Sequence, residues 1–533
     1  WQVARCLHFL PSLTGAVGTV GGTHLAGWHK FAPAHPNPAP GPGVWNDLLY
    51  PKEYPLAHYE MSFLMPHLMK DKGHKVDTYF TRVYNPVWTN PDGFMWINML
   101  KDHDKMGCHV ALTPTWNETS WFADYVLPMG IATERHDNQS QETHPARWVG
   151  LRQPVMRVAR EKLGENITDS RETNPGEVWE EDELQIELSW RIDPDGSLGI
   201  RKHFESPYRP GEKITVDEYY RYMFENNVPG LPAAAEKEGL SPLEYMRKYG
   251  VFTTEDNIFE VHMREMGAEA LEGTDVDETS GAVRKGGKPV GNMSKGAARN
   301  GFGTPSKKLE FYSGTMADWK WPEQVLPRYE KTHVYWRDMK RDKNEFDLLP
   351  NYRLPTLIHT RSGVKWLYEI THNNPLWVHT SDAKRLGLKT GDLARVETPI
   401  GHYVTRCWVT ESIKPGIVAM AHHMGRWRLT EDMGAPKIAS ALVRIDEKEN
   451  GKYAMRQIHG AQPFKSDDPD TERIWWREVG VNQNLTFPVN PDPVSGMHCW
   501  HQPVKVFKAA PHERYGDIEV DTEKSYEHYK KWM

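Results

Sequence analysis

A short polar cluster interrupts one of the most apolar stretches of the chain. In TPTWNETSWFADYVLP, residues 113–128, the side chains of Asn117, Glu118, Thr119 and Asp124 stand among Trp, Phe, Val and Leu. Amide, carboxylate and hydroxyl groups at this spacing offer hydrogen-bond donors and acceptors side by side. The elements on either side of the cluster decide what it faces.

Those elements read as a β-α-β unit. A β-rich run covers residues 76–83 and ends at Asn85-Pro86, a helical pattern covers 94–102, HVALTP forms a short strand, and WNETSWFADYVLP reads as a loop and a strand. This order predicts a parallel sheet whose ligand site lies at the carboxyl ends of its strands. The polar loops at Asn85 and at 117–119 both fall at such ends.

A glycine cluster near the start of the chain favours a turn over a phosphate site. The spacing of apolar residues predicts a helix over Gln2–Leu13, and TGAVGTVGGTHLAG follows it with a GxxGxxGG pattern. That pattern is not G-x-G-x-x-G, and it follows a helix instead of a strand, so a helix stop is the better interpretation. The Pro-rich FAPAHPNPAPGPG predicts an extended surface or cleft-lining loop.

Composition limits the class of protein. The 533 residues suggest two to four domains, with 38% hydrophobic and 26% charged residues, as in soluble globular proteins. A net charge of -7 argues against nucleic acid as the partner. No apolar run reaches the roughly 18 to 20 residues of a membrane span, so we expect any membrane attachment to come through other subunits.

The cysteines and the first residue carry two further expectations. Cys6, Cys108, Cys407 and Cys499 are far apart and form no C-x-x-C pair, so we expect scattered, mostly buried thiols and no iron–sulfur or zinc site from this chain alone. The sequence opens on Trp1 inside an amphipathic pattern, without Met or a signal-like segment. We expect it to be a piece whose beginning lies elsewhere.

The middle and the last parts of the chain differ in character. Residues 151–344 are charged and helical, with 271–300 predicted as a long loop or partner-facing excursion and GFGTPSKKLEFYS as a turn leading into a strand. In 345–533 we predict a short helix capped near Ser381 and stopped at Gly387, then strands separated by turns at 399–401 and 415–416. Short strands at this spacing indicate a small β-barrel.

Several segments together resemble a known family. NET followed by ADYVLP, the NP loop, TPSKKLEFYS, NNPLWVHTSDAKRLGLKTGDLARVETPIG and IKPGIVAMAHHMG are similar, in this order, to the catalytic subunits of the molybdopterin oxidoreductase superfamily of the dimethyl sulfoxide reductase type. The similarity runs along the whole chain and is weakest in the middle.

The resemblance implies a fold and a cofactor. The fold class would be α/β, with a Rossmann-like parallel-sheet domain at 1–150, a mixed helical region at 151–344 and a double-psi β-barrel-like domain at 345–533. The cofactor would be bis-molybdopterin guanine dinucleotide with Mo or W, lying in a cleft between the α/β domain and the barrel. A guanine edge presents adjacent N–H donors that a carboxylate such as Glu118 can accept.

The resemblance also assigns cofactor-binding residues, and it assigns none as catalytic or as a metal ligand. The loops of the α/β domain would contribute one group, and the loops of the barrel the other. The first group is Asn85, Pro86, Asn117, Glu118 and Thr119. The second group is His359, Arg361, Ser362, His372, Asn373, Asn374, His422, His423, Gly425, Asn482 and Asn484. Pterins and diphosphates are rich in acceptors, which suits Arg361 and backbone amides.

One departure from the family concerns the metal. Such subunits normally supply a [4Fe-4S] cluster and a metal-ligating residue from their N-terminal part, and the first residues here resemble the helix that follows both. We therefore expect the chain to be the carboxyl-terminal part of the catalytic subunit, with the cluster in the missing N-terminal part or in a partner. Expected partners are that N-terminal part, a membrane quinone-interacting subunit, and a ferredoxin-like iron–sulfur subunit, on the periplasmic face of a membrane.

The function implied is two-electron redox chemistry on a small substrate in anaerobic respiration. Formate oxidation and reduction of sulfur or arsenic oxyanions both remain open. One alternative is a homologous scaffold or electron-relay subunit that has lost the cofactor. The other is an unrelated α/β binding protein with a fused barrel.

Overall fold

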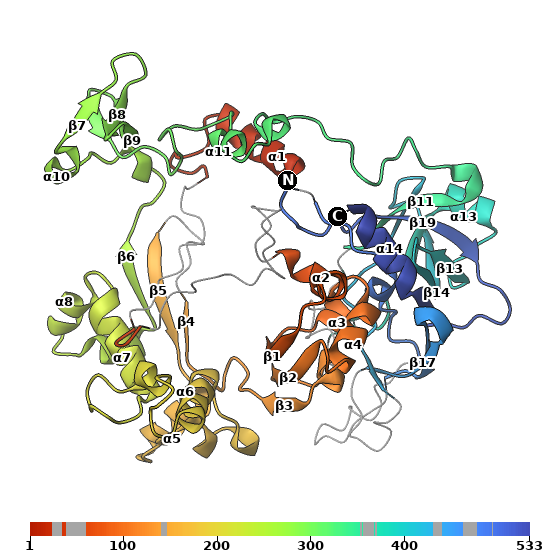
Figure 1. The fold of residues 1–533 in the computed structure, drawn as a ribbon, viewed down its shortest axis with the longest axis horizontal. Helices are drawn as coiled ribbons and strands as arrows, with labels where there is room; N and C mark the ends of the chain where they lie inside the picture. Colours follow the sequence, from red (N-terminus) through yellow and green to blue (C-terminus); the bar gives the residue numbers. More distant parts are fainter. Residues whose placement is uncertain are drawn as a thin grey trace. The chain divides into compact units, whose positions relative to one another are not determined.

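The protein divides into two compact units that interleave along the chain. One unit comprises residues 1–41 and 129–330, and the other comprises 42–128 and 331–533. Figure 1 follows the chain from red to blue. The computed structural model describes residues 1–23, 35–38, 60–139, 146–351, 354, 367, 370–429, 440–461, 477–492 and 494–532.

The predicted β-α-β segment forms a parallel sheet in the second unit. Strands β1 (Val76–Arg82), β2 (Met106–Thr113) and β3 (Tyr125–Pro128) lie in the order β1-β2-β3, and both pairings are parallel. Three helices accompany them: α2 (Met65–Lys72), α3 (Pro86–Thr89) and α4 (Gly93–Lys101). The prediction of a parallel sheet with polar loops at its carboxyl edge is confirmed.

The last part of the chain closes a β-barrel, as predicted. Six strands pair in a ring, β12-β15-β11-β19-β13-β14, and β14 pairs again with β12. Their bounds are β11 Glu345–Leu349, β12 Leu376–His379, β13 Leu393–Glu397, β14 Gly401–Thr410, β15 Ile417–Ala419 and β19 Gln502–Lys508. The sheet continues from β14 through β20 (Ile518–Asp521), β18 (Lys452–His459), β17 (Ala441–Lys448) and β16 (Trp427–Leu429).

Local signals predicted the barrel helix well. Helix α13 (Thr380–Leu386) begins where the His379 side chain accepts a hydrogen bond from the Ser381 amide. It ends at Gly387, whose left-handed backbone (φ 66°) stops the helix without a Cβ penalty.

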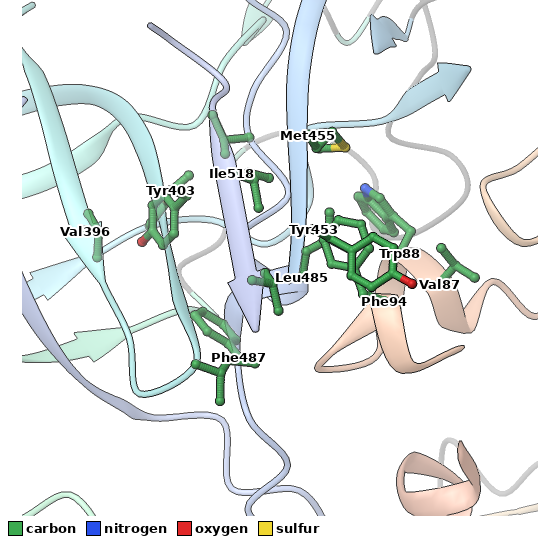
Figure 2. Packing of buried hydrophobic residues seen from close by; sticks show 14 of the residues in the cluster. Val87, Trp88, Phe94, Val396, Tyr403, Tyr453, Met455, Leu485, Phe487 and Ile518 are labelled. Atoms are coloured by element: carbon green, nitrogen blue, oxygen red, sulfur yellow. The ribbon is translucent and has the colours of Figure 1, made fainter. Parts of the chain in front are cut away.

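One hydrophobic core joins the parallel sheet to the barrel. Val87, Trp88 and Phe94 come from helices beside the sheet and pack with Tyr453 and Leu485 of the barrel side, as Figure 2 shows. This shared core explains why residues 60–128 group with 331–533, whereas the sequence prediction placed them in a domain spanning 1–150. Helix α14 (Thr522–Trp532) closes the same unit and buries Thr522, Ser525 and Tyr529.

The first unit is helical with small antiparallel sheets. Helix α1 (Gln2–Leu13) matches its predicted bounds, and Gly15, Gly18 and Gly21 after it have left-handed backbones, so the helix-stop interpretation is confirmed. A core that includes Val149, Phe224 and Met246 lies among helices and a three-stranded sheet. The elements are α5 Val155–Lys162, α6 Glu181–Ile192, α7 Val216–Asn227, α8 Leu231–Glu236, α9 Pro242–Tyr249, β4 Asp137–Gln139, β5 Arg147–Arg152 and β6 Val251–Glu255.

Two predictions for this unit are wrong. Residues 271–300 are not a long loop, because they form the antiparallel sheet β10-β9-β8-β7 beside the short helix α10 (Ala268–Leu271). Its strands are β7 Thr274–Val276, β8 Ala282–Lys285, β9 Lys288–Ser294 and β10 Ala297–Arg299. GFGTPSKKLEFYS leads to no strand and is followed by helix α11 (Gly314–Asp318).

Two general expectations can also be compared with the structure. Cys407 alone among the four cysteines is buried, so the expectation of mostly buried thiols is wrong. In the part of the chain that the structure describes, no helix has the length and apolar character to span a membrane.

Candidate cofactor-binding site

Asn85 and Thr119 join the two loops at the carboxyl edge of the parallel sheet. Asn85 Oδ1 accepts hydrogen bonds from the Thr119 amide (3.0 Å) and from Thr119 Oγ1 (2.8 Å). Thr119 Oγ1 in turn accepts one from the Val87 amide (3.1 Å). Both side chains are buried, and these contacts fix the amide orientation of Asn85.

Glu118 extends this arrangement to the barrel side. Its Oε2 accepts from Asn85 Nδ2 (2.7 Å), and its Oε1 accepts from Arg426 Nε (2.8 Å) and from the Trp427 amide (2.8 Å). Glu118 is fully buried and Arg426 is 6% exposed, so Glu118 is not a solvated carboxylate of a surface loop. We call Asn85, Glu118, Thr119 and Arg426, with the amides of Val87 and Trp427, the Glu118 network.

Asn117 and Asp124 make hydrogen bonds with strand β2 and with the loop that follows it. Asn117 Oδ1 accepts from the Ser120 amide (2.9 Å), and its Nδ2 donates to Thr113 Oγ1 (3.2 Å). Asp124 Oδ2 accepts from the His109 amide on β2 (2.7 Å). Burial lowers the pKa of the His109 imidazole, which keeps this ring neutral beside the loop. These two polar residues therefore shape the loop between β2 and β3.

The segment after β15 reaches the same place from the barrel. Trp88 Nε1 donates to the Gly425 carbonyl oxygen (3.1 Å), directly before Arg426. Gly425 takes a left-handed backbone (φ 82°), and a Cβ there would lie 2.3 Å from the Asn482 nitrogen. No larger residue fits this close approach without displacing backbone.

Three predicted asparagines from the barrel loops meet at this point. Asn374 is fully bonded, since its Nδ2 donates to the Ala421 (2.6 Å) and Val481 (3.0 Å) carbonyls and its Oδ1 accepts from the Val481 amide (2.8 Å). Asn484 Nδ2 donates to the carbonyls of residues 88 and 89, but its Oδ1 has no partner among the described residues. Within the same described part of the chain, Asn482 Nδ2 is also without a partner, although the residue is only 3% exposed.

The remaining predicted residues differ in how deeply they are buried. His423 is buried and its ring centroid lies 4.0 Å from that of His422, which stacks on Trp500 at 6.1 Å. Pro86 is buried at the start of α3. His372 is exposed and Asn373 is half-buried.

Three predicted residues fall in another part of the chain. His359, Arg361 and Ser362 lie outside the described residues. Within the described ranges, no group of three or more His, Cys, Asp or Glu side chains could hold a metal ion.

Sequence reasoning missed Arg426 and Gln483. Gln483 is fully buried, and its Nε2 donates to the Pro350 (3.1 Å) and Met420 (3.3 Å) carbonyls. Arg426 directly follows the HHMG run that the sequence singled out, and an arginine at the mouth of an apolar strand requires a buried acceptor. That signal was available, but it did not identify Glu118, 308 positions away, as the acceptor.

Comparisons with known proteins add the family. Residues 352–452 match the family model described as the molydopterin dinucleotide binding domain. The chain is 22% identical to trimethylamine-N-oxide reductase of Haemophilus influenzae over 78% of this chain and 46% of that protein. It is 24% identical to the thiosulfate reductase molybdopterin-containing subunit PhsA of Salmonella typhimurium, over 60% of this chain and 34% of that protein.

These matches support the assignment of the chain to the molybdopterin oxidoreductase superfamily. It spans less than half the length of these curated relatives. A superfamily assignment also removes the alternative of an unrelated α/β binding protein.

A solved structure has a similar fold. Acetylene hydratase from Pelobacter acetylenicus aligns with a TM-score of 0.50 at 16% identity, over 85% of this chain and 47% of that one. This likeness concerns the fold alone. In our chain, the segment that matches the family model (residues 352–452) begins after β11 and ends at the first residue of β18, so it contains most of the barrel.

Proposed function

We propose that this chain is part of the catalytic subunit of a molybdenum oxidoreductase that holds bis-molybdopterin guanine dinucleotide. The match to a dinucleotide-binding domain over residues 352–452 supports a cofactor of this class. In the same proposal the three-stranded parallel sheet is the Rossmann-like element, and the closed six-stranded ring is a barrel of the double-psi type.

The unsatisfied amides of Asn482 and Asn484 carry the proposal. Buried polar atoms in folded proteins nearly always have a partner, so two unpaired atoms in one short segment suggest a ligand. One is a donor (Asn482 Nδ2) and the other an acceptor (Asn484 Oδ1). Guanine and pterin edges present donors and acceptors side by side, which these two amides can match.

The backbone segments around these asparagines pack closely against each other. Gly425 and Gly480 both have left-handed backbones, and a Cβ on Gly480 would lie 2.6 Å from the Gly425 nitrogen. Side chains are thus excluded where the segments after β15 and before η13 (Gln483–Thr486) approach each other. Such bare backbone allows close approach of a ligand or of another chain segment.

The proposed roles of the predicted residues now divide in two. Asn482, Asn484, His422 and His423 would contact the cofactor, together with His359, Arg361 and Ser362. The polar side chains in the loops of the parallel sheet would fix the positions of the loops that face the cofactor. When bound, the molybdenum–pterin group supplies a two-electron redox change. The chain's own residues would bind it, orient it and exclude water from it.

Reduction of a small oxidised substrate is the reaction we favour. The relatives named above are reductases of trimethylamine N-oxide and of thiosulfate. Others are named as an arsenate respiratory reductase of Chrysiogenes arsenatis and a tetrathionate reductase of Archaeoglobus fulgidus. Reduction of an oxyanion or N-oxide in anaerobic respiration is therefore proposed ahead of formate oxidation, with partner subunits that deliver the electrons.

The proposal is tested on the native assembly that contains this chain. Metal analysis should find molybdenum in the purified assembly, and acid denaturation should release a fluorescent pterin. Reduced viologen should then be consumed on addition of an oxyanion or N-oxide. A folded assembly without molybdenum or pterin would overturn the proposal and would favour a cofactor-free scaffold.

A further inference from the structure

The four side chains of the Glu118 network have nearly complete hydrogen bonding within the protein. Asn85 Oδ1 receives two donors from Thr119, and Asn85 Nδ2 donates to Glu118. Both oxygens of Glu118 receive donors from Arg426 or its neighbour. These contacts leave the Glu118 carboxylate little capacity to accept from a guanine edge.

We propose that Glu118 is a positioning residue, which acts through Arg426 to fix the spacing of the cofactor-facing loops and is not itself a ligand of the cofactor. This inference rests on the proposed function. It changes the role first expected for Glu118 from direct recognition of the cofactor to alignment of the groups that recognise it.

The direction of each hydrogen bond makes the carboxylate necessary. The Thr119 donors require Asn85 to present Oδ1 to them, so Asn85 Nδ2 points at Glu118 as a donor. Position 118 must then accept at one oxygen from Asn85 and at the other from Arg426 and the Trp427 amide. A glutamine at 118 has only one acceptor oxygen, so its amide nitrogen would face the Asn85 donor.

The network reaches Asn482 through Gly425. Trp88 holds the Gly425 carbonyl, and Arg426 follows in the chain. Because Gly425 packs against the Asn482 backbone, a shift of Arg426 would move Asn482 as well. Loss of the carboxylate should therefore disturb the cofactor site without removing any group that touches the cofactor.

An exchange of side chains separates positioning from direct recognition. The single variants are Glu118→Gln and Asn85→Asp, and the double variant carries both changes. In the double variant, the oxygen of the introduced glutamine amide can accept from Arg426 and Trp427, and its nitrogen can donate to the introduced carboxylate at position 85. That carboxylate still accepts from Thr119. The net charge is kept, and so are the donor–acceptor pairs between positions 85 and 118 and those at the Glu118 Oε1 position, but the carboxylate has moved and the second contact of Arg426 Nε, with Oε2 (3.0 Å), is lost.

The measurement is the rate at which the native assembly, carrying each variant, loses pterin after dilution. We expect each single variant to lose it at least about tenfold faster than wild type, as the loss of one buried hydrogen bond implies. The double variant should recover most of this loss. Glu513→Gln is the control, because it breaks the ion pair with Arg395 elsewhere in the barrel and should leave the rate unchanged.

A second readout does not require the cofactor. Hydrogen exchange of the peptides that contain Val87, Thr119 and Trp427 should rise in each single variant and return in the double variant, while exchange in the core strand β14 stays level. A merely global loss of stability would raise exchange in β14 as well.

Two results would overturn the inference. One is wild-type pterin retention by Glu118→Gln. The other is a double variant no better than Glu118→Gln, because the loss would then follow the carboxylate at 118 and show direct recognition. If the wild-type assembly holds no pterin, the proposed function fails, whereas the exchange measurements still test the positioning role.

Discussion

Replacing Gly425 by Ala should lower the stability of the barrel more than the same replacement at another glycine with a left-handed backbone. A Cβ on Gly425 would lie 2.3 Å from the Asn482 nitrogen and 2.4 Å from the Val481 carbonyl carbon. Both are backbone atoms, so neither can rotate away as a side chain would. Gly387 has a similar left-handed backbone, but nothing lies within 4 Å of its Cβ position.

The two costs can be separated by magnitude. A left-handed Ala costs about 1–2 kcal/mol, and both variants bear this cost. Overpacking of a fixed site adds about 1–3 kcal/mol, which applies to Gly425→Ala alone. Alanine also restricts the conformational freedom of the unfolded chain, which stabilises both variants by about 0.4–1 kcal/mol. We therefore expect Gly425→Ala to be less stable than Gly387→Ala by about 1–3 kcal/mol.

Native-state hydrogen exchange of β14 peptides is a suitable assay, because it reports on the barrel without assuming that both units unfold together. The opening free energy should fall in the order wild type, Gly387→Ala, Gly425→Ala. Equal losses in the two variants would refute the reasoning, since they would mean that the Val481–Asn482 backbone yields at no cost.

Helix α14 and its surroundings carry two further predictions. Burial lowers the pKa of His498 to about 3 and that of His528 to about 4, against 6.5 ordinarily. As pH falls below 6.5, these histidines take up protons in the unfolded chain before they do so in the folded protein. The free energy of unfolding should therefore decline from pH 6.5 toward 4. A urea midpoint that stays constant over this pH range would contradict the prediction. Ser525→Ala removes a donor from the fully buried Asp92 carboxylate and should cost about 1–3 kcal/mol, whereas the exposed Glu527→Ala should leave the urea midpoint unchanged.

Elements set by local pattern were predicted closely from the sequence. The bounds of α1 and α13 and the parallel order of β1, β2 and β3 follow from apolar spacing, turn residues and glycine stops. Each of these signals acts within a few residues of the element it determines, so no knowledge of distant segments is needed.

The missed sheet shows where the same method failed. Residues 274–299 are polar and rich in Gly and Lys, which resembles a loop by composition. Yet Gly286-Gly287 joins β8 to β9 as a two-residue connection, a hairpin signal that composition conceals. Conversely, the alternation in KKLEFYS predicted a strand, but the described structure offers it no neighbouring strand to pair with.

The candidate site was only half predictable, for a physical reason. The side chains of Asn85, Glu118 and Asn482 look equally suited to grip a ligand, because residue type shows hydrogen-bonding capacity and not its use. In the structure, distant partners occupy most of the hydrogen-bonding capacity of Asn85 and Glu118, whereas Asn482 Nδ2 has no partner among the described residues. Since Arg426 lies 308 positions from Glu118, no local pattern could reveal which polar residue was already occupied. In the function that we propose, the unpaired atoms, and not the most polar stretch of sequence, are therefore where the cofactor would bind.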